Sequence, residues 1–135
     1  MTNVVPMSRP LRLALLADAA ASGVTAALLV AGADFLESLL VLPVALIRGA
    51  GMVLTPYVIL VIFVASRPAT RVNTVNAIIG INAAWTAASA LLLVSGLVVP
   101  SALGMTFVLA QGLAVGAFGV IQYVCLRHAA GAVAA

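Results

Sequence analysis

The feature that most constrains the fold is an apolar run at residues 11–32, LRLALLADAAASGVTAALLVAG, which one acid, Asp18, interrupts. At about 1.5 Å per residue, a helix of this length crosses the ~30 Å hydrocarbon core of a bilayer. Further apolar runs of similar length predict three more helices, over residues 44–66, 72–97 and 102–127. We therefore expect an all-α integral membrane protein, a four-helix up-down bundle that forms a single domain over residues 1–135.

The composition supports lipid as the outer solvent. Hydrophobic residues make up 65% of the chain and charged residues 7%, and a water-soluble domain of this size could not bury so much apolar surface. The net charge of +3 comes from six basic residues, all arginine, that lie mostly near helix ends. We interpret them as orientation signals and headgroup contacts, so we expect membrane lipids as partners and no nucleic acid.

The distribution of charge predicts the orientation. Four spans place both termini on one side of the membrane, and that side carries five arginines, Arg9, Arg12, Arg67, Arg71 and Arg127. The acids Asp34 and Glu37 fall on the other side, in residues 34–42, which form either a short amphipathic turn at the interface or a plain loop. The positive-inside rule then predicts that both termini are cytoplasmic.

Polar residues inside the spans are the candidate functional residues. Asp18 and Ser22 share one face of the first helix with Thr25, and Arg48 shares a face of the second with Thr55 and Met52. We expect both faces to point into the bundle. The third and fourth helices add Asn82, Gln111 and Gln122, and these five residues, Asp18, Arg48, Asn82, Gln111 and Gln122, would define a ligand or proton pathway.

Asp18 and Arg48 each allow two interpretations. A carboxylate at the bilayer centre costs roughly 2.5–3.5 kcal/mol, so Asp18 is either a protonatable transport group or a packing residue that hydrogen-bonds to Gln122, Asn76 or Arg12. Arg48 either binds an anionic headgroup or ligand with help from Gln111, or pairs with Asp34 or Glu37 near the interface.

Small residues predict close helix contacts. Gly112, Gly116 and Gly119 share a face of the fourth helix, and Gly80 belongs to a small-residue face of the third. The glycine face of the fourth helix fits a homodimer interface and an internal contact equally well. Trp85 lies well inside the third helix, where it fills core or lines a cavity.

No chemical motif stands out. Cys125 and His128 form a C-x-x-H pair with too few ligands for a zinc site, and a single cysteine excludes an internal disulfide. Nucleophile, phosphate-binding and metalloprotease motifs are absent from the sequence. We therefore expect no metal, no cofactor and no catalytic residues.

Four stretches carry a resemblance: residues 12–32, RGAGMVLTP at 48–56, NAAWTAASALLLVSG at 82–96 and residues 102–123. Together they resemble a group of small four-helix bacterial inner-membrane proteins. The resemblance implies a location in the bacterial inner (plasma) membrane and brings no activity with it.

Two functions remain open from the sequence. The first is a non-enzymatic, accessory or structural membrane protein that acts through lipid or protein contacts, as a homo-oligomer or within a larger complex. The second is a small oligomeric transporter or ligand-binding bundle in which Asp18 is the protonatable group.

Overall fold

The computed structural model describes residues 3–135, which form five helices and two short strands. The helices are α1 (Arg9–Ala31), α2 (Ala33–Leu40), α3 (Val44–Ser66), α4 (Val72–Val94) and α5 (Ala102–Ala134), and the strands are β1 (Val4–Pro6) and β2 (Ala69–Arg71). Within this range α1, α3, α4 and α5 are each long and apolar enough to cross a membrane. The prediction of an all-α protein with four such helices is confirmed.

Local sequence explains where the long helices begin and end. The side chain of Ser8 accepts a hydrogen bond from the Leu11 amide, and a proline follows in the first turn, so α1 begins at Arg9. Helix α4 ends at Val94, three residues before the predicted end at 97, because Gly96 takes a left-handed conformation with φ +74°. Helix α5 continues past the predicted end at 127 to Ala134, since its last turns are rich in alanine.

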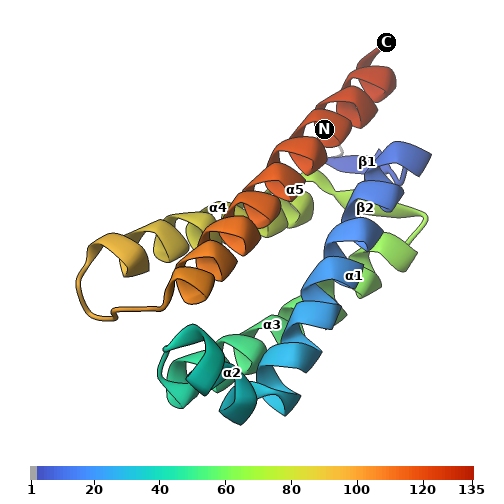
Figure 1. Cartoon of the computed structure of the whole chain (residues 1–135). Coiled ribbons are helices and arrows are strands. Elements are labelled where there is room, and N and C mark those ends of the chain that lie inside the picture. The colour runs from blue at the N-terminus through green and yellow to red at the C-terminus, as the bar shows by residue number, and fades with distance from the viewer. Residues whose placement is uncertain (1–2) are drawn as a thin grey trace.

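The four long helices pack as two pairs. Helix α1 lies along α3 and α4 lies along α5, with further contacts between α1 and α5, whereas α3 and α4 contact one another little. In Figure 1 the α1–α3 pair and the α4–α5 pair diverge from the end of the molecule that carries β1 and β2. The molecule is therefore closed along α1 and α5 and looser between α3 and α4.

Hydrogen bonds tie the chain together at both ends. Strand β1 pairs antiparallel with β2, with Val5 opposite Thr70, which joins the N-terminal segment to the α3–α4 link. At the opposite end the backbone N–H of Ser101 donates to the carbonyl of Leu40 at 3.0 Å. The start of α5 is thereby attached to the end of α2.

Residues 34–42 are mostly helical. Helix α2 buries Leu36 and Leu40 and exposes Asp34 and Phe35, so it is a short amphipathic helix rather than a plain loop. It ends at Val41, which adopts the left-handed conformation with φ 54°. That conformation is rare for a β-branched residue.

The outer surface of the long helices is apolar. Bulky side chains with large exposed fractions occur on every span, for example Val24 at 72%, Ile59 at 64% and Leu113 at 70%. A water-soluble monomer rarely exposes so extensive an apolar surface. The surface suits contact with lipid chains.

The predicted inward face of α3 is wrong. Arg48, Met52 and Thr55 are exposed, and the buried side of this helix carries Leu54 and Tyr57 instead. Thr55 satisfies its hydroxyl by donating to the carbonyl of Gly51 at 2.9 Å, one turn back in the same helix. Its polarity therefore does not require a partner inside the bundle.

Candidate functional site

Five polar side chains meet in the interior where the two helix pairs converge. We call them the Asp18 cluster: Asp18, Ser22, Tyr57, Asn82 and Gln122. They come from α1, α3, α4 and α5, and Asp18 and Gln122 are completely inaccessible to solvent. Every long helix thus contributes a hydrogen-bonding group to one buried point.

The Asp18 carboxyl is the centre of this cluster. Its Oδ1 accepts a hydrogen bond from the Ser22 hydroxyl at 3.0 Å. Three atoms lie around its Oδ2: the Tyr57 hydroxyl at 2.7 Å, the Asn82 amide nitrogen at 3.0 Å and the Gln122 amide nitrogen at 2.7 Å. The carboxyl therefore joins all four long helices.

Two further contacts close the network. The Asn82 amide nitrogen also donates to Gln122 Oε1 at 3.1 Å, and the Tyr57 hydroxyl lies 2.7 Å from Asn82 Oδ1. Throughout residues 3–135, every buried side-chain nitrogen and oxygen has a hydrogen-bond partner. Such a mutually satisfied network suits an apolar interior, where an unpaired polar group is costly.

Glycines in α5 bring α4 close enough for this network to form. A Cβ atom at Gly112 would lie 3.2 Å from Ser89, one at Gly116 3.2 Å from Thr86 and one at Gly119 3.4 Å from the Cβ of Asn82. Helix α4 of the same chain therefore covers the predicted glycine face. Gly80, by contrast, has no neighbouring atom within 4 Å of where its Cβ would be.

The second candidate site is a crevice between α3 and α4, which begins beside the cluster and runs towards α2. Its volume is about 440 Å³, within the range of small-molecule sites. Small residues on both walls, Ala45, Gly49 and Ala50 on α3 and Ala88 on α4, leave this space open. Side chains of α1 and α5, such as Leu29 and Phe107, line it further.

The polar groups of the α3–α4 crevice are bound to one another. The Trp85 indole N–H donates to Gln111 Oε1 at 2.7 Å, and Gln111 Nε2 donates to the Ser89 hydroxyl at 2.9 Å. All three side chains are half-buried and line the crevice. Because their donors and acceptors are already paired, these side chains leave few hydrogen-bonding groups for a ligand. The crevice therefore suits an apolar ligand, which it would bind mainly through van der Waals contact.

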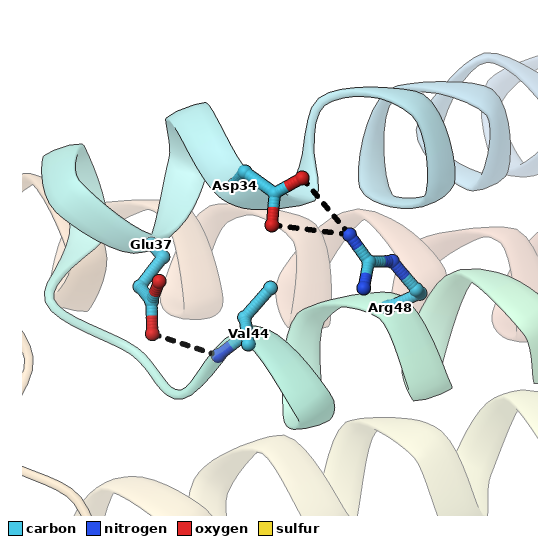
Figure 2. A network of polar contacts seen from close by, with 4 residues as sticks. All are labelled: Asp34, Glu37, Val44 and Arg48. Carbon is cyan, nitrogen blue, oxygen red and sulfur yellow. Dashed lines mark hydrogen bonds and ion pairs between the residues drawn. The ribbon is translucent and has the colours of Figure 1, made fainter.

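Arg48 lies outside both sites. Its Nη2 contacts both carboxylate oxygens of Asp34, at 3.2 and 3.1 Å, and both side chains are exposed (Figure 2). Nearby, Glu37 accepts a hydrogen bond at 3.4 Å from the backbone N–H of Val44, at the start of α3 (Figure 2). These contacts fasten α2 to α3, and at this exposure the ion pair adds little stability.

The structure thus separates the five predicted pathway residues. It brings Asp18, Asn82 and Gln122 together, places Gln111 in the crevice and puts Arg48 at the surface. Tyr57, which the sequence reasoning missed, lies with Leu54 and Val61 on the buried side of α3, and its hydroxyl inside an apolar run was the only signal for it.

Comparison with known protein families, with curated proteins and with solved structures finds no match for this chain. Within residues 3–135, no three histidine, cysteine, aspartate or glutamate side chains gather in a way that could hold a metal ion.

Proposed function

We propose that this chain is a multi-pass protein of the bacterial inner membrane that acts through contacts with lipid and has no catalytic role of its own. The α3–α4 crevice would hold one aliphatic chain of a membrane lipid. The observation that carries the proposal is an open, largely aliphatic space between two helices that are long and apolar enough to span a bilayer.

The choice of an aliphatic chain follows from the surroundings of the crevice. The helices that form it present apolar side chains to the outside, so the phase next to its opening would be the acyl-chain region. Its polar groups, Trp85, Gln111 and Ser89, are paired with one another. A ligand with many hydrogen-bonding groups would therefore find few free partners.

The single tryptophan offers a direct test. Trp85 is the only tryptophan in the chain, and it lines the crevice. In bilayers of phospholipids with brominated acyl chains, we expect strong quenching of its fluorescence, because the bromine atoms would lie against the indole ring.

A matched pair of variants separates the crevice from general contact with lipid. Gly49→Phe places an aromatic ring in the crevice, and Gly80→Phe places one outside it; neither Cβ would meet an atom within 4 Å. We expect Gly49→Phe to reduce the quenching and Gly80→Phe to leave it near the wild-type level. Equal quenching in the wild type and Gly49→Phe would refute an acyl chain in the crevice.

We further propose that the helices cross the bilayer in alternating directions, with both termini in the cytoplasm. Arg67 and Arg71 flank the link that pairs with the N-terminal segment, while Asp34 and Glu37 lie at the opposite end of the long helices. This charge asymmetry supports the orientation.

Cysteine labelling of intact cells tests this orientation. In a Cys125→Ser background, Ala69→Cys should react only after the membrane is permeabilised, and Leu97→Cys should react from outside. Both positions are exposed in links between long helices. Labelling of both positions from the same side would contradict the proposed topology. It would not affect the proposal that the crevice holds an acyl chain, which the tryptophan measurement tests separately.

A further inference from the structure

The Asp18 carboxyl has no cation to balance a negative charge. It is fully buried in the middle of α1, and the one ion pair within residues 3–135 joins Arg48 to Asp34. The side chains that contact it are the hydroxyls of Ser22 and Tyr57 and the amides of Asn82 and Gln122. Tyr57, from α3, is the one titratable group among them, since α4 and α5 contribute uncharged amides.

The number of hydrogens around Tyr57 is informative. Its hydroxyl oxygen lies 2.7 Å from Asp18 Oδ2 and also 2.7 Å from Asn82 Oδ1. A tyrosine hydroxyl carries one hydrogen, while a carboxylate oxygen and an amide oxygen are acceptors only. With an ionised Asp18, one of these two short oxygen–oxygen contacts therefore contains no hydrogen.

Rotating the side-chain amides does not remove the problem. If the Asn82 amide is turned, its oxygen faces Asp18 Oδ2 at 3.0 Å and Gln122 Oε1 at 3.1 Å. Turning the Gln122 amide as well relieves the second contact, but it places the Gln122 oxygen 2.7 Å from Asp18 Oδ2. Each orientation leaves at least one contact between acceptors when Asp18 is charged.

We propose that Asp18 is a proton-binding site and that its neutral carboxyl holds the four helices together. The added hydrogen lies on Oδ2 and is donated to the Tyr57 hydroxyl, which donates its own hydrogen to Asn82 Oδ1. Asn82 and Gln122 keep their donated bonds to Oδ2, and Asn82 keeps its bond to Gln122 Oε1. The four contacts at Asp18 Oδ2 and the Tyr57 hydroxyl, and the contact between Asn82 and Gln122, then contain one hydrogen each, and Ser22 still donates to Oδ1.

This assignment is independent of the proposed lipid contact, because it concerns the closed cluster and not the crevice. It gives the carboxyl a specific role as a hydrogen-bond donor between α1 and α3. A charged carboxylate could not fill that role.

Isotope labelling can test the proton directly. The chain contains two aspartates, Asp18 and Asp34, so the variant Asp34→Asn leaves Asp18 as the only one. With ¹³C at the aspartate carboxyl, infrared and solid-state NMR spectra in bilayers at neutral pH should show a protonated carboxylic acid. Asp18→Asn, which retains the exposed Asp34, supplies the carboxylate signal for comparison. A carboxylate signal from Asp18 would overturn the proposal.

A second variant tests where the hydrogen points. Tyr57→Phe removes the proposed acceptor with little change in side-chain shape, so the carbonyl band of the Asp18 acid should move to higher frequency as its O–H loses a hydrogen bond. Circular dichroism would confirm that the helices are retained. An unshifted band would overturn the donation to Tyr57.

Discussion

The bundle contains two sets of polar side chains that differ in how they are enclosed. In the Asp18 cluster, side chains from four helices surround a carboxyl that is fully buried. In the α3–α4 crevice, Trp85, Ser89 and Gln111 are half-buried and border a cavity of about 440 Å³. Polar side chains thus hold the helices together where the helices converge, and similar side chains border an open cavity where the helices diverge.

The difference arises from the size of the side chains between the helices. At the cluster, large polar side chains such as Tyr57 and Gln122 reach across from α3 and α5 and fill the interior. In the crevice, Gly49 and Ala88 face the space with almost no side chain. We therefore expect loss of a hydrogen bond to lower stability most at the cluster. In the crevice, we expect added side-chain volume to have the larger effect.

The largest effect should come from replacing one glutamine in each region. Gln122→Leu removes one hydrogen-bond partner each from Asp18 Oδ2 and from the Asn82 amide nitrogen in the buried interior, and we expect a loss of about 1–3 kcal/mol in the free energy of unfolding. Gln111→Leu removes bonds to half-buried partners and should cost about 0.6 kcal/mol, the average for hydrogen bonds in membranes. Titration of micelle-bound protein with SDS, followed by circular dichroism, measures both. Equal losses would remove the distinction between the two regions.

The next effect should come from the close contact between the start of α5 and the end of α2. A Cβ atom at Gly104, at the start of α5, would lie 2.1 Å from the Leu40 carbonyl oxygen, a distance that requires the backbone to move. Gly104→Ala should therefore cost about 1–2 kcal/mol of stability through overpacking.

A glycine elsewhere in α5 provides the control. Gly131 has nothing within 4 Å of its Cβ position, so Gly131→Ala should be neutral or stabilising by up to about 1 kcal/mol through helix propensity. If Gly104→Ala were tolerated equally well, α2 and α5 could not be in the close contact described here.

These two regions also show what the sequence could predict. Hydropathy suffices for the four long helices, because each is an apolar run long enough to cross a bilayer. It does not determine which face points inward, since lipid-facing and buried residues are both apolar. For this reason Tyr57 was missed, and Arg48 and Thr55 were placed on the inner side of α3.

The candidate site was predictable in part. An acid inside an apolar run identifies Asp18 as costly to bury, and Gln122, one of its expected partners, does contact it. Asn76, another expected partner, is exposed, and Asn82 contacts Asp18 instead. The crevice could not be predicted, because it depends on the divergence of α3 from α4. Spacing along one helix contains no information about that divergence, although Ala45, Gly49 and Val53 do form a stripe of lining residues.

The smallest effect concerns the backbone at the α2 end of the crevice. Val41 adopts φ 54° between two lining residues, Leu40 and Leu42, in a conformation that asparagine tolerates better than a β-branched residue. Because Val41 is 55% exposed, Val41→Asn loses little burial and should raise stability by about 0.5–1 kcal/mol. Val99→Asn, in the exposed α4–α5 link and with ordinary φ, controls for added polarity. A gain in the first variant and not in the second, measured by SDS titration, would show that the left-handed backbone at Val41 is strained; equal responses would show that it is not.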